Sequence, residues 1–276
     1  MSSKTKQFYE KEYFSKHLPE YEGKNGLLKL QEGLNILEGE SGAGKTVLAM
    51  RQTELSYWAI NPDGTYQKDE RGYGVPYFQE IVLCTLKQNT KQDWEYFFKT
   101  KFNRKMLAIP PSMLDQVYNE IETRHADARA ARLPVMPKTL LIIDDIIGKE
   151  NQDVTYIQNS AAMKEISSAS RHDGVTCVYL SQSSIFVPLV AFTNAKYKAI
   201  FKFDTDNERK HLFNKVFGAR EYVTHIKDAP KSVREEYFNR EMDSLKTYQC
   251  IIVYKYITDP GTRQAKTIHK IYKYRV

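Results

Sequence analysis

Short apolar runs recur along the chain and alternate with segments of mixed polarity. The runs have the length and the nearly continuous hydrophobicity of strands buried on both faces of a parallel sheet, and they occupy 34–39, 78–86, 139–145, 175–181 and 197–204. The segments between them have helical spacing of apolar residues, at 90–102, 112–133 and 153–170 and directly after 39–46. This alternation predicts an α/β fold with a doubly wound parallel sheet between helices.

The two ends of the chain differ from this central pattern. Residues 1–30 are polar and aromatic, and we expect an N-terminal arm that packs on the domain or on a neighbouring molecule. Residues 31–276 are expected to form one domain, with its core at 34–204 and a helical and β-hairpin portion at 205–276. Helical patterns fill 206–246, and two β-rich runs then flank the turn signal "TDPGTR", which predicts a C-terminal β-hairpin. The Gly- and Pro-containing segment 61–77 predicts an exposed loop or a hairpin.

A glycine-rich loop joins the first strand to the first helix. Its sequence "GESGAGKT" matches the phosphate-binding pattern G-x-x-x-x-G-K-[ST]. Gly42 and Gly44 let backbone N–H groups approach phosphate oxygens, Lys45 reaches the β- and γ-phosphates, and Thr46 coordinates Mg²⁺. The sequence therefore predicts binding of ATP with Mg²⁺ by Gly39, Glu40, Ser41, Gly42, Ala43, Gly44, Lys45 and Thr46.

Two acidic residues follow the apolar run at 139–143. Asp144 has the position of a Walker B aspartate, which holds Mg²⁺ beside Thr46. Asp145 is the candidate general base for the attacking water, although a glutamate is usual there and Asp145 can instead hydrogen-bond the next loop. Glu38 is the weaker alternative base.

A further strand candidate lies between the phosphate-binding loop and Asp144 in the sequence. Such an inserted strand is typical of the additional-strand class of P-loop NTPases, which includes motors, helicases and recombinases. Most kinases and GTPases lack it, and the GTPase motif N-K-x-D is also absent from the sequence.

The stretch "ASRHDGVTCVYLSQ" follows the acidic strand and ends at Gln182. Gln182 can donate to a γ-phosphate oxygen and orient water, or it can simply begin a polar loop. Arg171 lies before the strand, where it can complement a helix C-terminus or, in a ring of subunits, reach the neighbour's nucleotide as an arginine finger. His172 is interpreted as structural or solvent-facing.

The charge of the chain permits a polyanionic partner. Lys and Arg number 41 against 34 Asp and Glu, which gives a net charge of +7. Basic candidates for contact with DNA phosphates are Lys99, Lys101, Arg104, Lys105, Arg124, Arg129 and Arg132. Three scattered cysteines and six distant histidines indicate neither a disulfide framework nor a further metal site. The charged first residues and the absence of long apolar runs predict an intracellular protein without a membrane segment.

Several of these motifs together resemble one family. "GESGAGKT", "LLIIDDIIGK" and "SRHDGVTCVYLSQSSIFVPLVAFTNAKY" are similar to the poxvirus A32-type genome-packaging ATPases of the FtsK–HerA superfamily, which share the Asp-Asp pair, the Arg-His pair, the strand ending in Gln, and a later Pro and Asn. The matching Pro and Asn here are Pro188 and Asn194. The resemblance covers about residues 34–204.

The resemblance implies an ATP-driven translocase of double-stranded DNA that fills a preformed viral capsid. It further implies a homo-oligomeric ring of five or six subunits, capsid vertex or portal-like partners, and a place at viral assembly sites in the host cytoplasm or nucleus, or on the virion. The alternatives are a Zot-like assembly NTPase, which should carry a membrane span, another helicase-like P-loop ATPase, a nucleotide kinase, and a non-enzymatic scaffold that binds ATP.

Overall fold

The computed structural model describes most of the chain. The described residues are Leu18, Glu20, 28–133, 135–146, 157–168, 174–216, Ile226, 228–258 and 266–276.

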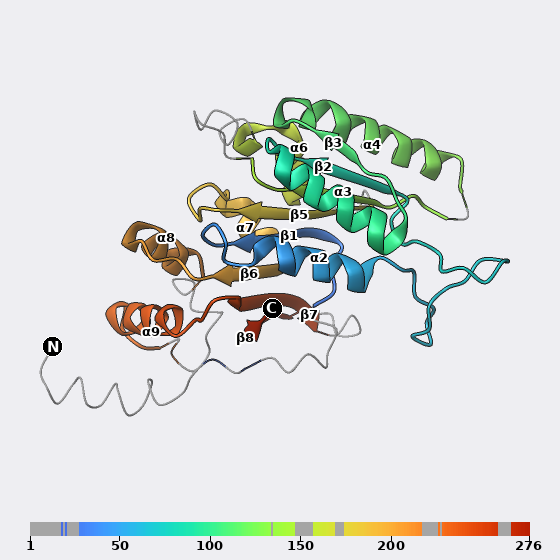
Figure 1. The fold of residues 1–276 in the computed structure, drawn as a ribbon. Coiled ribbons are helices and arrows are strands. Elements are labelled where there is room, and N and C mark those ends of the chain that lie inside the picture. The colour runs from blue at the N-terminus through green and yellow to red at the C-terminus, as the bar shows by residue number, and fades with distance from the viewer. Residues whose placement is uncertain are drawn as a thin grey trace, which may run out of the picture.

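One eight-stranded sheet organises the molecule, in the order β3-β2-β4-β5-β1-β6-β7-β8 (Figure 1). Its strands are β1 (Gly33–Glu38), β2 (Glu80–Cys84), β3 (Leu107–Ile109), β4 (Thr139–Ile143), β5 (Val175–Ser181), β6 (Tyr197–Phe201), β7 (Gln249–Thr258) and β8 (Lys266–Arg275). The strands from β1 to β6 are parallel, whereas β7 pairs antiparallel with β6, and β8 pairs antiparallel with β7. The C-terminal hairpin therefore extends the parallel sheet at the β6 edge.

Helices cover both faces of the sheet. The helices are α2 (Lys45–Ser56), α3 (Gln88–Phe102), α4 (Leu114–Ala130), α6 (Ala161–Ser168), α7 (Leu189–Asn194), α8 (Asp206–Val216) and α9 (Lys231–Asp243), with a 3-10 turn at Pro111–Met113. Side chains of α2 and α3 belong to one buried cluster, and side chains from α4 to α9 belong to the other. Neighbouring strand residues such as Ile36 and Leu37 point into opposite clusters, as the two-residue period of a strand requires.

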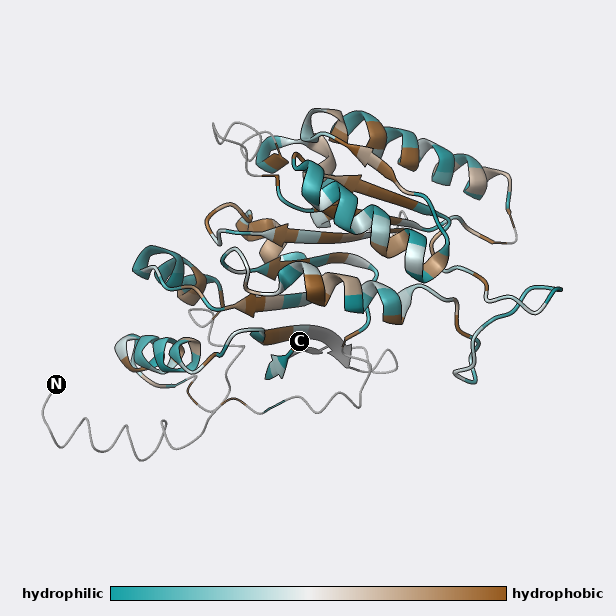
Figure 2. Cartoon of the chain, in the orientation of Figure 1, coloured by the Kyte–Doolittle hydropathy of each residue, from teal (hydrophilic) through white to brown (hydrophobic). Residues whose placement is uncertain are grey.

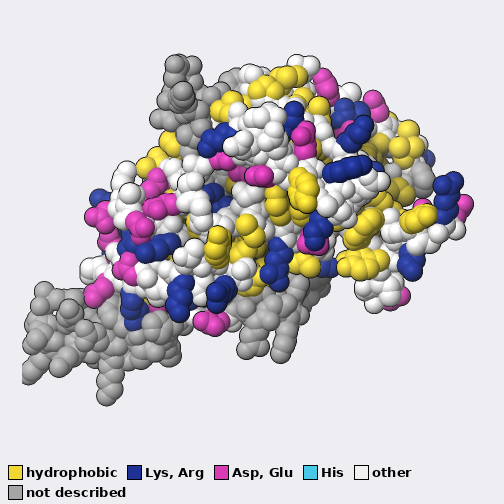
Figure 3. Space-filling model, viewed as in Figure 1, with side chains coloured by type: hydrophobic (Ala, Val, Ile, Leu, Met, Phe, Trp, Pro, Cys, Tyr) yellow, Lys and Arg dark blue, Asp and Glu magenta, His cyan; other side chains and the backbone are white. Residues whose placement is uncertain are grey.

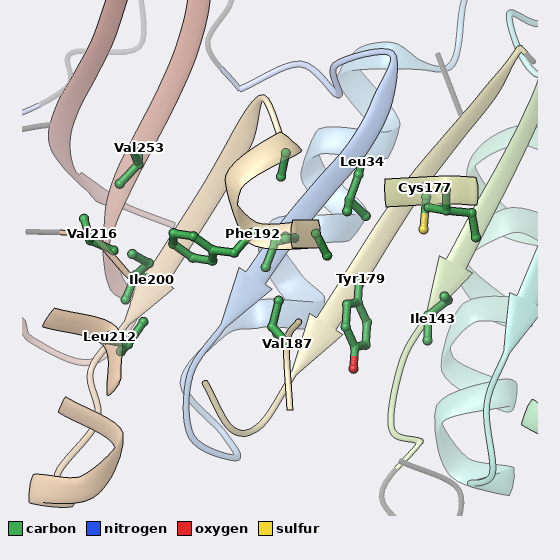
Figure 4. Packing of buried hydrophobic residues seen from close by; sticks show 14 of the residues in the cluster. Leu34, Ile143, Cys177, Tyr179, Val187, Phe192, Ile200, Leu212, Val216 and Val253 are labelled. Atoms are coloured by element: carbon green, nitrogen blue, oxygen red, sulfur yellow. The ribbon is translucent and has the colours of Figure 1, made fainter. Parts of the chain in front are cut away.

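Hydrophobic residues, coloured brown in Figure 2, are concentrated in the strands of the sheet and alternate with hydrophilic ones along the helices. Figure 4 shows part of the cluster between the sheet and the helices from α4 to α9. In it, Phe192 of α7 lies beside Ile200 of β6, and Val187 lies beside Tyr179 of β5. These strands are buried along their whole length, which explains why their sequences are nearly continuous apolar runs.

The predicted α/β fold, its parallel sheet and its C-terminal hairpin are confirmed. Segment 61–77 folds back on itself through antiparallel bridges such as Lys68↔Gly74. The helical pattern at 206–246 corresponds to two separate helices, α8 and α9. Of the predicted N-terminal arm, Leu18 is buried against the domain. No helix in the described ranges is long and apolar enough to cross a membrane.

The order of the strands corrects one detail of the sequence analysis. The strand between β1 and β4 in the sheet is β5, whereas β2, which lies between the loop and Asp144 in the sequence, pairs on the outer side of β4. The chain thus has the strand arrangement of an additional-strand P-loop NTPase, but the separating strand is the one that ends before Gln182.

Candidate nucleotide-binding site

The carboxyl ends of β1, β4 and β5 meet at one edge of the sheet, because these strands are parallel neighbours. The residues that directly follow them therefore converge there, as ligand-binding residues do in open α/β sheets. A pocket of about 250 Å³ opens at this edge. Its lining consists of Ser41, Gly42, Gly44, Lys45, Thr46, Val47, Asp144, Asp145, Gln182 and Tyr248.

The glycine-rich loop follows β1 and leads directly into α2. Gly42 and Gly44 have φ values of 76° and 106°, a region that side chains with a Cβ rarely adopt. Gly44 caps α2, and neither a capping side chain nor an acidic residue occupies the first turn of this helix. The N-terminal N–H groups of α2 are therefore available to an anion.

Lys45 lies at the bottom of this loop and is only 7% exposed. Its ammonium group donates to the carbonyl oxygens of Gly39 at 2.7 Å and Glu40 at 2.8 Å. Burial lowers the pKa of Lys45 to about 8, although nearby Asp144 and Asp145 act in the opposite direction. The loop thus holds a buried ammonium group in the pocket.

Asp144 is the most buried acid of the pocket, with 3% of its surface exposed. Its Oδ2 atom accepts from the hydroxyl of Thr46 at 3.2 Å and from the indole Nε1 of Trp94 at 3.1 Å. Burial raises the pKa of Asp144 to about 6, and the two hydrogen bonds oppose this rise. The structure therefore brings together the predicted metal ligands, Thr46 and Asp144, and adds Trp94, which the sequence analysis did not identify.

Asp145 is held by donors from two elements. Its Oδ1 atom accepts from Lys87 at 3.2 Å and from the Nε2 atom of Gln182 at 2.5 Å, while its Oδ2 atom accepts from Thr90 at 2.6 Å. Its backbone has a φ of 50°, in the left-handed region. The two residues predicted to act on the γ-phosphate, Asp145 and Gln182, are therefore in direct contact.

Glu38, the alternative base, lies outside this pocket. Its side chain is fully buried and forms an ion pair of 3.8 Å with Lys215 of α8. Burial raises the pKa of Glu38 to about 7, and the charge of Lys215 opposes the rise. A carboxylate buried in this way has no access to water in the pocket, so the geometry favours Asp145 over Glu38.

Arg171 and His172 lie outside the described residues, since the described chain resumes at Gly174 before β5. Pro188 directly precedes α7, and Asn194, its last residue, donates to the carbonyl of Ser167 at 2.9 Å. These two residues thus fix the short helix that covers β1 and β6.

Of the predicted DNA-binding residues, Lys99 and Lys101 lie on α3, and Arg124 and Arg129 lie on α4, two helices whose buried side chains belong to opposite clusters. Arg104 and Lys105 lie between α3 and β3, and Arg132 lies just after α4. Several of them contact their own chain: Lys101 pairs with Glu54 at 2.9 Å, Arg124 pairs with Glu80 at 2.8 Å, and Arg104 donates to the carbonyl of Gln79 at 2.6 Å. Lys105 and Arg132 are exposed. Lys99 donates to Asn103 at 2.7 Å.

Basic and acidic side chains are interspersed on the face shown in Figure 3. On the described part of that face, the basic side chains do not form a continuous stripe along which DNA would run. The predicted DNA contacts remain predictions.

Comparison with known proteins gives similarity of structure only. No family model and no curated protein matches the sequence. Among solved structures, the genome packaging NTPase B204 of Sulfolobus turreted icosahedral virus 2, in complex with ATPγS, is 13% identical with a TM-score of 0.47, over 89% of this chain and 98% of that one.

Two larger proteins give similar sequence identities and TM-scores. The pCW3 conjugation coupling protein TcpA is 10% identical with a TM-score of 0.47, over 89% of this chain and 61% of its own. The type VII secretion ATPase EccC of Thermomonospora curvata is 13% identical with a TM-score of 0.48, over 93% of this chain and 26% of its own cytoplasmic domain. At these low values the likeness establishes neither a family nor a function for this chain.

Proposed function

We propose that this chain is an ATPase that translocates double-stranded DNA, and that its biological task is to package a viral genome into a preformed capsid. The observation that carries the ATPase part is the convergence in one pocket of the glycine-rich loop, Lys45, Thr46 and Asp144 with Asp145 and Gln182.

The loop and the start of α2 supply the binding site for the triphosphate. Phosphate oxygens accept from the backbone N–H groups at the N-terminus of α2, where the helix dipole also favours negative charge. Lys45 then exchanges its two carbonyl acceptors for phosphate oxygens. Charge-assisted hydrogen bonds of this kind are stronger than neutral ones, which favours the exchange.

Thr46 and Asp144 are suited to hold Mg²⁺. A hydroxyl and a carboxylate oxygen lie 3.2 Å apart, and Mg²⁺ in nucleotide sites commonly takes one or two protein ligands beside water and phosphate. A cation also compensates for the burial of the Asp144 carboxylate, which is otherwise costly. When bound, Mg²⁺ neutralises charge that develops on the phosphates.

Asp145 is the proposed acceptor of the proton from the attacking water. Its carboxylate is occupied by Lys87, Thr90 and Gln182 in this structure. If Gln182 turns toward the γ-phosphate, it frees a lone pair on Oδ1 of Asp145 for water. Binding of the γ-phosphate by Gln182 would thereby make the Asp145 carboxylate available to accept a proton from water.

The DNA and capsid parts of the proposal rest on the resemblance to the A32-type branch of the FtsK–HerA superfamily. They comprise a homo-oligomeric ring of five or six subunits, Arg171 acting on the neighbour's nucleotide, basic residues tracking DNA phosphates, and capsid vertex proteins as partners. The proposed place of action is the viral assembly site in the host cytoplasm or nucleus.

A test of the function compares ATP hydrolysis without DNA, with double-stranded DNA and with single strands. We expect double-stranded DNA to stimulate the wild type and single strands to have little effect. Lys45→Ala should lose ATP binding, while Asp145→Asn should bind ATP and lose turnover by two or more orders of magnitude, on the order expected for a general base. Near-normal turnover of Asp145→Asn would remove Asp145 as the base.

A further inference from the structure

The pocket contains an aromatic side chain to which the ATPase proposal gives no role. Tyr248 lies just before β7 and lines the same pocket as the glycine-rich loop and the two acidic residues. It comes from the C-terminal part of the chain, about two hundred positions after the loop, so its spacing in the sequence gives no hint of this contact.

The Tyr248 ring lies against the glycine-rich loop. A Cβ atom added at Gly44 would lie 2.7 Å from Cδ1 and 3.4 Å from Cε1 of Tyr248, so the ring edge occupies the space that Gly44 leaves open. Val47, in the first turn of α2, lines the same pocket and is 54% exposed. Tyr248 and Val47 thus form an apolar part of the lining beside the N-terminus of α2.

Tyr248 is exposed although it is aromatic. Its exposed fraction is 48%, whereas most of the aromatic side chains that the structure describes are buried in the two clusters. Because one edge of the ring contacts the loop, a large part of the remaining ring surface faces outward. An exposed aromatic side chain in the wall of a pocket is suited to bind a planar ligand.

The backbone holds this side chain in place. Tyr248 has a φ of 61°, which is unusual for a bulky residue. Its carbonyl accepts from the N–H of Val276 at 2.8 Å. The turn around it is closed by two hydrogen bonds between Gln249 and Lys246. The backbone N–H of Gln249 donates to the carbonyl of Lys246 at 2.9 Å, and the backbone N–H of Lys246 donates to the side-chain oxygen of Gln249 at 2.9 Å. A strained conformation that is fixed on both sides is a feature often found at ligand sites.

We propose that Tyr248 is the platform on which the nucleobase of the bound triphosphate stacks, with Val47 as the apolar neighbour. The inference rests on the proposed ATPase function. Phosphates bound at the N-terminus of α2 leave the rest of the nucleotide to extend along the pocket wall, and Tyr248 offers an aromatic face there. Stacking on one tyrosine accepts any base but favours purines, which have the larger ring surface.

The test compares ATP with inorganic tripolyphosphate, which has the phosphates but no base. Binding of each ligand in the presence of Mg²⁺ is measured by calorimetry for the wild type, Tyr248→Gly, Tyr248→Phe and Lys45→Ala. Glycine is chosen because it accepts a φ of 61° without strain, so the ring is lost while the turn is kept. The thermal unfolding midpoint of each variant checks that it is folded.

We expect Tyr248→Gly to weaken ATP binding about ten-fold or more, as loss of an aromatic stacking partner typically does. Tripolyphosphate binding should stay within about two-fold of the wild type, and Tyr248→Phe should bind both ligands normally. ATP should also bind more tightly than CTP to the wild type, and this difference should shrink in Tyr248→Gly.

Two results would overturn the platform. Equal weakening of both ligands would mean that the ring only supports the glycine-rich loop, and unchanged ATP binding would mean that it has no part in binding. Lys45→Ala distinguishes failure of the stacking proposal from failure of the ATPase proposal, because this variant should bind both ATP and tripolyphosphate more weakly. If Lys45→Ala binds both ligands normally, or if the wild type binds neither, the triphosphate site itself is wrong.

Discussion

At the scale of single residues, the hydrogen bond from Trp94 to Asp144 has the clearest consequence. The indole donates to the Oδ2 atom that also accepts from Thr46, so residues of α3 and α2 together fix the carboxylate. Partners that orient a metal ligand commonly matter almost as much as the ligand itself. Trp94 is therefore a positioning residue for the proposed Mg²⁺ ligand.

Trp94→Phe keeps an aromatic ring in the core but removes the donor to Asp144. We expect the Mg²⁺ concentration for half-maximal ATP hydrolysis to rise about ten-fold, the usual scale for such partners. Trp58→Phe is the matched control, because Trp58 packs on Tyr57 and Phe102 away from the pocket. Equal Mg²⁺ requirements in both variants would show that the indole does not position Asp144.

Glu38 gives a prediction about stability and pH. Its pKa is raised to about 7 by burial, against 4.5 for an unperturbed glutamate, so the folded state binds more protons than the unfolded state between these values. The free energy of unfolding therefore falls as pH rises through this window. Glu38→Gln cannot titrate, so its stability relative to the wild type should increase from about pH 5 to pH 7 and then level off.

Chemical denaturation at several pH values measures this difference. Glu70→Gln, in the exposed segment before β2, is the matched control, because it removes an exposed carboxylate in place of a buried one. A constant difference for Glu38→Gln would contradict the raised pKa of Glu38.

At the scale of elements, the start of α3 holds both acidic residues of the site. Lys87 directly precedes this helix, and Thr90 and Trp94 are one turn apart on it. Because these residues donate to Asp145 and Asp144, a small movement of α3 changes the orientation of both carboxylates together.

Thr90→Val tests this coupling by removing one donor to Asp145 at nearly constant shape. We expect kcat for ATP to fall about ten-fold with little change in KM, because a general base that is less well fixed affects the reaction more than binding. Thr100→Val is the control on the same helix, since the Thr100 hydroxyl bonds only to the Tyr96 carbonyl in the described structure. A similar kcat in both variants would exclude a positioning role for Thr90.

The elements also show how far the sequence allows prediction. β4 and β5 were predictable because they are buried on both faces and their sequences are therefore mostly apolar. β3 has three residues at the sheet edge, with Leu107 53% exposed, and α7 has six, so neither gives a recognisable period.

Within the site, local motifs predicted the loop and Asp144, because strand, loop and helix are contiguous there. The tertiary contacts were not predictable. Trp94 has the spacing of a core residue, and the position of Tyr248 depends on an unusual φ and on a hydrogen bond from Val276.

At the scale of the whole molecule, the proposed ring predicts that subunits depend on one another. If Arg171 completes the neighbour's site, Arg171→Ala subunits keep an intact nucleotide pocket and can receive the arginine of a Lys45→Ala neighbour. A mixture of these two variants, each inactive alone, should therefore recover DNA-stimulated ATP hydrolysis. Lys210→Ala, which removes an exposed basic residue of α8, is the control and should hydrolyse ATP without any partner. No recovery in the mixture would show that Arg171 acts, if at all, within its own subunit.

Movement along duplex DNA is the central claim, and displacement of a triplex-forming third strand measures it most directly. With ATP, the wild type should displace the third strand after a lag that grows with the length of duplex between the loading site and the triplex, while Lys45→Ala and Asp145→Asn should not. Hydrolysis of ATP in the presence of the same DNA, without any displacement, would contradict the account.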